Sequence, residues 1–122
     1  MLFSIDDTAH PITYIPHERE YRVWLRRITD AQYQAISDKL KEMTDTGDVH
    51  TSSWMPGRDW SNTVFQPIWE LACLKNDEAA AKCFGILLWE AMMNRPEAWS
   101  FGRFEKNSIP IEGMTYYRIY PT

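Results

Sequence analysis

The sequence predicts an α+β domain in which an antiparallel sheet, formed by N- and C-terminal strands, packs against about three helices from the middle of the chain. Segments with the alternating or aromatic-rich character of strands lie near both ends of the 122 residues, and segments with helical spacing lie between them. The length corresponds to one domain, and internal repeats and low-complexity tracts are absent. We therefore expect a single compact domain over residues 1–122.

Two strands are expected in the N-terminal part. Residues 1–7 begin with an apolar run and lack the basic start and long apolar core of a secretory signal, so we interpret them as a first strand. Residues 20–28 show a period of two, which is typical of a strand with one buried face. The two expected faces carry Tyr21, Val23 and Leu25 on one side and Arg22, Trp24 and Arg26 on the other.

Helical signals begin at Thr29, which forms a capping box with Gln32. Apolar residues then recur every three or four positions up to Gly47, which can close this amphipathic helix. These apolar residues are Tyr33, Ile36, Leu40 and Met43. Pro67 fits the first turn of a second helix, which would end near Lys75. Its inward side would carry Ile68, Leu71 and Ala72.

A third helix is predicted from a cap at Asn76 to about Asn94. Between residues 79 and 93 its only charged residues are Lys82 and Glu90, so it is apolar almost all round. Such a helix is either the central core helix or part of a subunit interface. With the second helix it would form an antiparallel hairpin.

The chain returns to strand-forming sequence near its C-terminal end. Residues 99–105 and 115–120 are rich in aromatic side chains, and turn signals lie between them at 107–108 and 112–113. We expect these two segments to form an antiparallel pair.

Composition limits the class of protein. The 13 basic and 17 acidic residues give a net charge of −4, which argues against broad attraction to nucleic acid or anionic membranes. The longest apolar stretch, residues 83–89, is far shorter than the roughly 20 residues that span a bilayer. Cys73 and Cys83 have no metal or redox spacing, which favours buried free thiols in a reducing cytosol. A disulfide between adjacent helices stays open as the alternative, and we expect a cytoplasmic protein.

The segment 50–60 carries the strongest candidate binding residues. Two tryptophans flank a Pro-Gly pair that fits a type II turn, and a charged donor and acceptor follow. Apolar walls with few polar groups are typical of small-ligand pockets. The candidate ligand-binding residues are Trp54, Met55, Arg58, Asp59 and Trp60. The alternative is that the two indoles are anchors that hold a long connection on the core.

A group of basic residues near the first helix signal offers a second candidate. Arg beside an aromatic ring on a strand face suits single-stranded nucleic acid or a phosphorylated ligand. The residues are Arg19, Arg22, Arg26 and Arg27, with Trp24 among them. Because the net charge is negative and no ribonucleoprotein motif is present, we favour a covered or solvated face and expect no nucleic-acid partner.

Catalytic signals are few. The three histidines, His10, His17 and His50, have no zinc spacing, so we expect no metal, and no motif calls for a cofactor. A Cys83–His50–Asp59 arrangement is disfavoured because burial would raise the pKa of the thiol. The enzymatic alternative is a small hydrolase or isomerase that uses His50 or Glu105 as the acid–base group. Arg58 or Arg103 would then hold an anionic substrate.

Several short segments carry a resemblance to a family. They are WMPGRDW (54–60), FQPI (65–68), AAKCFG (80–85), FGRFE (101–105) and GMTY (113–116). Together they resemble a group of small uncharacterised bacterial proteins, some of which are carried on mobile integron gene cassettes. The resemblance covers residues 50–120 and implies a bacterial, cytosolic accessory role. It implies no activity, cofactor or catalytic residue.

The surplus of aromatic side chains and the lack of catalytic motifs favour a non-enzymatic binding protein. The chain holds 6 Trp, 6 Tyr and 5 Phe, each of which buries a large apolar area. We expect it to hold an apolar or aromatic small molecule, or a partner surface, near the 54–60 loop. The apolar third helix and the aromatic strands also suggest a homodimer, because interface cores favour such residues.

Overall fold

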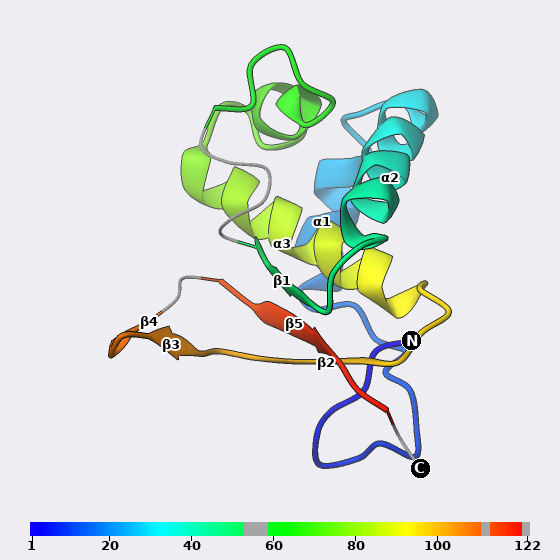
Figure 1. Ribbon diagram of the computed structural model, residues 1–122. Helices are drawn as coiled ribbons and strands as arrows, with labels where there is room; N and C mark the ends of the chain where they lie inside the picture. Colours follow the sequence, from blue (N-terminus) through cyan, green and yellow to red (C-terminus); the bar gives the residue numbers. More distant parts are fainter. Residues whose placement is uncertain (53–58, 111–112, 121–122) are drawn as a thin grey trace.

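The structure, a computed structural model, describes residues 1–52, 59–110 and 113–120 (Figure 1). Over these residues the helices are α1 (Glu18–Leu25), α2 (Asp30–Thr44), the short π-helix η2 (Ile68–Ala72) and α3 (Asp77–Met93). The strands are β1 (Val49–Thr51), β2 (Trp99–Gly102), β3 (Glu105–Lys106), β4 (Ile109–Pro110) and β5 (Thr115–Arg118). The predicted fold class is confirmed: an antiparallel sheet is combined with helices from the middle of the chain.

The main sheet has the strand order β1-β5-β2, and both pairs are antiparallel. Tyr116 of β5 pairs with His50 on one side and Phe101 on the other, and its side chain is buried. The buried hydroxyls of Thr51 and Thr115 lie 3.0 Å apart and share a hydrogen bond. Since each hydroxyl can donate and accept, this pair stabilises the register of β1 against β5.

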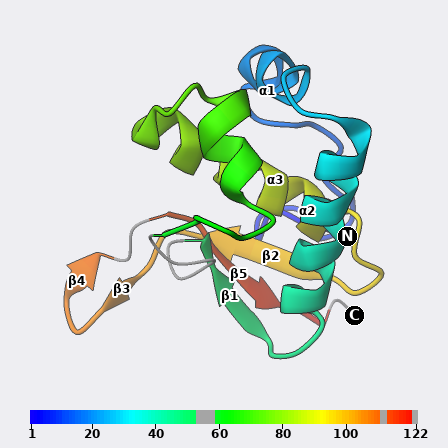
Figure 2. The same cartoon turned by 90° about the horizontal axis from the view of Figure 1, so that it is seen from above.

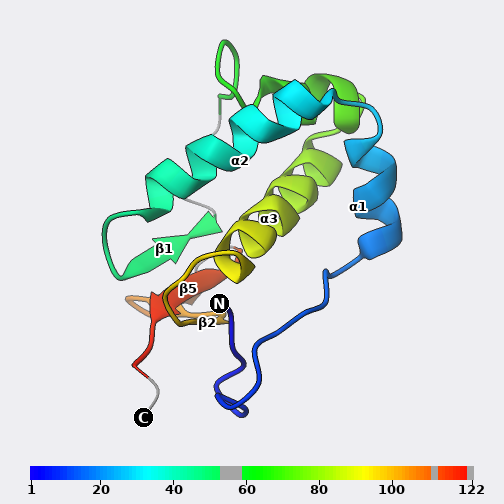
Figure 3. The same ribbon diagram turned by 90° about the vertical axis from the view of Figure 1, so that its right-hand side faces the viewer.

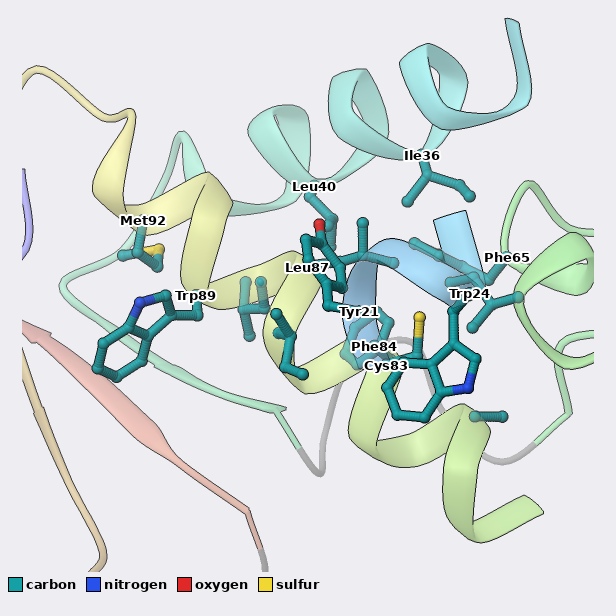
Figure 4. Packing of buried hydrophobic residues seen from close by; sticks show 14 of the residues in the cluster. Tyr21, Trp24, Ile36, Leu40, Phe65, Cys83, Phe84, Leu87, Trp89 and Met92 are labelled. Carbon is teal, nitrogen blue, oxygen red and sulfur yellow. The ribbon is translucent and has the colours of Figure 1, made fainter. Parts of the chain in front are cut away.

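Helix α3 lies between the sheet on one side and α1 and α2 on the other (Figures 1 and 3). Side chains of all three helices meet in the core, as Figure 4 shows for Tyr21 and Trp24 of α1 and Leu40 of α2. The buried residues of α3 are Ala80, Cys83, Phe84, Ile86, Leu87, Leu88, Trp89 and Met92. Of the two roles expected for this apolar segment, the structure therefore gives it the central core position.

The predicted strand over 20–28 is wrong, because this segment forms α1. Tyr21 and Trp24 are both buried, and a separation of three residues places them on one face of a helix. Val23, expected inside, is 43% exposed. The alternating pattern is thus a by-product of a short helix with one narrow apolar stripe. The strand face with Trp24 between Arg22 and Arg26 does not form, so the basis for a nucleic-acid platform is lost.

Residues 1–7 do not form a regular strand either. Leu2 is fully buried, but it makes only an isolated parallel bridge with Trp99. A turn follows at once, in which the amide of Asp7 donates to the carbonyl of Ser4 over 3.0 Å. The third strand of the sheet is instead β1, which the sequence pattern did not predict.

The predicted N-terminal caps of α2 and α3 are confirmed. The side chains and backbone amides of Thr29 and Gln32 bond reciprocally in the predicted capping box at the start of α2. The Asn76 side chain accepts from the amide of Ala79 over 2.9 Å at the start of α3. At the other end, α2 stops at Thr44, before the predicted cap at Gly47.

The second predicted helix is shorter and wound differently. It ends at Ala72, and the amide of Cys73 donates to the carbonyl of Ile68, five residues back, over 3.0 Å. This wider winding turns Leu71 outward, where it is 40% exposed, although the prediction placed it inside. Ile68 and Ala72 are buried as expected.

The predicted antiparallel pairing of the C-terminal segments is confirmed by β2 and β5. The first segment leaves the sheet at Gly102 and continues into the β3–β4 hairpin, which extends away from the helices (Figures 1 and 2). Asn107 and Ser108 both have positive φ at the tip of this hairpin, at 55° and 64°. Two consecutive residues with positive φ are typical of a tight hairpin turn. No helix among the described residues is long and apolar enough to cross a membrane.

Candidate functional site

A partly open cleft of about 450 Å³ lies where η2 meets the start of α3. In the ribbon this junction is at the end of the molecule away from the main sheet (Figures 1 and 3). Of the described residues, three segments line it: residues 59–61, the helical residues 66–69 at the start of η2, and the first turns of α3. The lining residues are Asp59, Trp60, Ser61, Gln66, Trp69, Asp77, Ala80 and Ala81. Two indoles, two carboxylates, an amide and a hydroxyl therefore surround one hollow.

Two of the predicted ligand-binding residues, Asp59 and Trp60, line this cleft. The other three, Trp54, Met55 and Arg58, lie outside the described residues, as does the Pro-Gly turn that was expected between the two tryptophans. The structure thus brings the C-terminal end of the predicted loop to a cavity.

The Trp60 ring packs against the core and also borders the cleft. Its centroid lies 5.7 Å from that of Phe84 on α3 and 6.5 Å from that of Phe65. Phe65 and Phe84 pack edge to face with each other at 5.5 Å and are both buried. Trp60 itself is only half-buried and borders the cleft. Trp60 therefore packs against the core, as the anchor interpretation expects, and also borders the cleft; the binding role stays a prediction.

Trp69 also lines the cleft, although the sequence pattern did not single it out as a candidate. Its indole Nε1 donates to Oδ1 of Asp77 over 2.7 Å, and the Lys75 ammonium lies 6.0 Å from its ring centroid. The predicted inward side of the second helix was Ile68, Leu71 and Ala72, which left Trp69 unassigned. The acidic cluster that follows the Asn76 cap was a signal that could have suggested a partner for the indole N–H.

Short hydrogen bonds hold the polar rim of the cleft in place. Oδ1 of Asp59 accepts from the amide of Ser61 over 2.9 Å, and its bonds with Ser61 lower the pKa of Asp59. Gln66 accepts from the amide of Asn62 over 3.0 Å and donates to Glu70 over 2.8 Å. Asp59 is therefore ionised at neutral pH, and the Gln66 amide has a set orientation.

The turn between η2 and α3 holds the two walls of the cleft together. Leu74 and Lys75 both have positive φ, at 51° and 65°, a region that non-glycine residues rarely occupy. The amide of Lys75 donates to the carbonyl of Trp69 over 2.6 Å. Such backbone conformations cost about 1–3 kcal/mol each and persist where surrounding structure holds them. Here they place Trp69 next to Asp77.

The two cysteines belong to the segments that meet at the η2–α3 junction. Both are free and buried, as the sequence analysis favoured. Their thiols are within hydrogen-bonding distance, and this bond together with burial raises the pKa of Cys83. Cys73 follows η2 and Cys83 belongs to α3, so the pair lies across the same junction that forms the cleft.

The residues of the enzymatic alternative do not gather at the cleft. His50 lies on β1, where its ring packs 5.4 Å from that of Trp99 and burial, followed by the charge of Arg95, lowers the pKa of His50. Arg103 and Glu105 are exposed beyond the end of β2. None of these three is among the described residues that line the cleft, and Arg58 lies outside the described residues.

Within the described part of the chain, no cluster of three or more histidine, cysteine, aspartate or glutamate side chains could hold a metal ion. Searches for relatives found no matching family model, curated protein or solved structure. The resemblance to integron-carried bacterial proteins therefore stays a prediction, and the site has to be interpreted from its own geometry.

Proposed function

We propose that this chain is a non-enzymatic binding protein that holds a small molecule with an apolar or aromatic body in the cleft between η2 and α3. The observation that carries the proposal is the pair of indoles, Trp60 and Trp69, lining one hollow of about 450 Å³. Small-ligand pockets have volumes of about 300–1,000 Å³ and combine aromatic walls with a few polar groups. The cleft meets this description.

Both indole rings of the cleft are held in place by neighbouring residues. Trp60 packs against the core through Phe84, and Trp69 is held by its bond to Asp77, so neither ring has to be ordered when a ligand enters. Binding to a preformed surface avoids part of the entropy cost of association. Ala80 and Ala81 of α3 contribute small side chains that leave the space between the rings open.

The lining groups favour binding over catalysis. Among the described residues at the cleft, the titratable groups are the carboxylates of Asp59 and Asp77. Hydrogen bonds lower the pKa of Asp59, whereas a general acid or base at neutral pH works best with a pKa near 7. Asp77 already accepts the indole N–H of Trp69. Both carboxylates are suited to orienting a ligand.

The cleft-filling variant Ala81→Leu tests the proposal. Ala81 is exposed on α3, so the larger leucine side chain fills part of the cleft without removing a contact from the core. The matched control is Ala35→Leu on the exposed face of α2. With indole as the probe, calorimetry should show binding to the native chain and to Ala35→Leu. Ala81→Leu should bind at least tenfold more weakly. Absence of indole binding, or equal binding by both variants, would overturn the proposal.

We also propose that the chain associates as a homodimer. Of the two features that suggested a dimer in the sequence, the apolar third helix and the aromatic strands, the helix no longer supports it. The apolar surface of α3 is covered within the chain, so it no longer supports an interface. Exposed apolar side chains elsewhere support an interface, among them Phe104 and Ile109 on the hairpin side and Tyr120 after β5. Light scattering during size-exclusion chromatography should give twice the monomer mass of 14.4 kDa. A monomer mass at every concentration would exclude the dimer.

A further inference from the structure

We infer that the cleft selects an organic cation, a molecule in which a protonated amine is joined to a planar aromatic body. This inference rests on the proposed function, because it names the class of ligand for the same site. It follows from three features of the described residues: the sign of the charges at the rim, the indole face of Trp69 and the position of Lys75.

Both charged side chains that line the described part of the cleft are carboxylates. Asp59 uses Oδ1 to accept from the Ser61 amide, and Asp77 uses Oδ1 to accept from the Trp69 indole. A carboxylate has room for about four hydrogen bonds, so each can accept a further N–H from a ligand. Charge-assisted bonds from an ammonium to a carboxylate are about twice as strong as neutral ones.

The surroundings keep this rim negative. Asp77 lies in the first turn of α3, where the helix dipole stabilises an anionic side chain. Glu70, whose carboxylate accepts from Gln66 over 2.8 Å, adds a further negative group one helical turn from the cleft wall. Among the described residues, Lys75 lies over the Trp69 ring, and Lys82, next to Ala81, pairs with Glu20 over 3.3 Å. The described lining residues themselves carry only the two negative charges. An anionic ligand would meet repulsion from two sides.

A cation of the chain itself lies over the indole of Trp69. The Lys75 ammonium lies 6.0 Å from the ring centroid, which is the range in which a cation is attracted by the negative face of an indole. Lys75 is exposed and long, and its backbone is fixed by the bond from its amide to the Trp69 carbonyl. Its side chain can leave the ring while the turn stays in place, so a ligand ammonium can take over the contact.

The aromatic walls distinguish an organic cation from a metal ion. A divalent metal takes several oxygen ligands in close geometry, whereas the described cleft offers two carboxylates among indole and methyl groups. The apolar walls instead suit the body of an aromatic amine, and the carboxylates suit its charged end.

Three probes with the same ring and different charge test the inference. Tryptamine is cationic near pH 7, indole-3-ethanol is neutral and indole-3-acetate is anionic. Calorimetry at low salt should show tryptamine binding about tenfold more tightly than indole-3-ethanol, with indole-3-acetate the weakest of the three. Added salt should weaken only the tryptamine complex by a large factor.

The outcomes separate the two proposals. If indole-3-ethanol binds as tightly as tryptamine, or indole-3-acetate binds best, the cleft is a binding site and the cation inference is wrong. If none of the three probes binds, the proposed function fails and the inference fails with it.

Isosteric variants assign the preference to the named groups. Asp59→Asn and Asp77→Asn keep an amide oxygen for their internal hydrogen bonds and remove the charge. Each should weaken the binding of tryptamine several-fold and the binding of indole-3-ethanol by a clearly smaller factor. Asp30→Asn, which removes a first-turn carboxylate from α2, is the matched control and should change neither. Equal losses for both probes would mean that the carboxylates have a structural role only, which would overturn the inference.

Lys75→Gln provides a readout that a structural role cannot imitate. It removes the Lys75 ammonium from the Trp69 ring, so tryptamine should bind to this variant several-fold more tightly than to the native chain. Weaker tryptamine binding in this variant would show that Lys75 does not compete with a cationic ligand, contrary to the inference.

Discussion

The indole Nε1 of Trp69 donates a 2.7 Å hydrogen bond to Oδ1 of Asp77, and this contact joins the π-helix to the first turn of α3. The two residues are separated by the strained turn at Leu74 and Lys75, so the bond closes a short loop. It also sets the direction of the indole plane at the cleft. One contact therefore links the stability of the η2–α3 junction to the shape of the candidate binding site.

Replacing Trp69 with phenylalanine should test this link. Trp69→Phe keeps an aromatic ring and removes the N–H, so the free energy of unfolding should fall by about 1 kcal/mol. Indole should also bind several-fold more weakly, because the ring loses its fixed orientation. Urea unfolding and calorimetry measure the two effects. Unchanged stability with unchanged indole binding would show that the bond to Asp77 orients nothing.

A second prediction concerns Glu90, which clamps two helices to α3. Its Oε1 accepts from the hydroxyl of Tyr21 on α1 over 3.1 Å and also from the hydroxyl of Tyr33 on α2. Burial is the largest cause that raises the pKa of both tyrosines, so they stay protonated donors. Glu90→Gln replaces a charged acceptor by a neutral one and should cost about 1–2 kcal/mol in urea unfolding.

The control for Glu90 is Glu42→Gln on α2. Glu42 is exposed and contacts Lys39 over 3.4 Å, and such surface ion pairs contribute little to the free energy of unfolding. Its effect should stay within about 0.5 kcal/mol. Equal losses in the two variants would mean that the tyrosine hydroxyls do not need the half-buried carboxylate of Glu90.

A third prediction concerns the stability of the folded chain at acidic pH. The buried Arg95 guanidinium donates to both oxygens of Glu97 at 2.9 Å, and this hydrogen bonding lowers the pKa of Glu97 from 4.5 to about 2. Because the folded pKa lies below the ordinary value, the stabilisation is fully present above 4.5. It is lost as the pH falls through about 2.

Glu97→Gln should therefore be less stable than the native chain at neutral pH, and the difference should shrink as the pH falls from 4.5 towards 2. Urea unfolding at a series of pH values measures it. A difference between the two chains that stays constant across this range would show that the ion pair with Arg95 contributes no pH dependence.

The fourth prediction concerns the thiols. Cys73 and Cys83 are 4% and 0% exposed, and their hydrogen bond together with burial raises the pKa of Cys83. Buried protonated thiols react slowly. Ellman's reagent should therefore modify both only when the chain is unfolded in guanidinium. Leu74→Cys introduces an exposed thiol next to Cys73 and should react at once. Rapid reaction of the native chain would contradict the burial of the pair.

The predictable parts of the fold are those with strong local signals. The Asn76 cap and the nearly all-round apolar sequence after it identify α3, and the aromatic runs identify the β2–β5 pair. Helix α1 was misassigned because its buried aromatics at 21 and 24 lie inside a run that also alternates. Strand β1 has three residues and little pattern of its own, since its position depends on pairing with β5, more than sixty residues away.

The site was predictable in part for the same reason. Asp59 and Trp60 stood out because an indole and a carboxylate follow a turn signal. Trp69 and Asp77 did not, because the π-helix rotates the side chains relative to an ordinary helix, and no sequence pattern distinguishes five residues wound in this way. The hydrogen bond between them depends on that rotation.

The place of β5 in the sheet has a consequence for biosynthesis. The outer strands β1 and β2 pair with β5 and not with each other, and β5 follows both in the sequence. A nascent chain on the ribosome can form its helices early, since their bonds are local. It cannot assemble the main sheet until Thr115–Arg118 has left the exit tunnel. Until then the face of α3 that the sheet will cover is open to chaperones, and ribosome-bound chains halted before this strand should be cleaved readily by proteases.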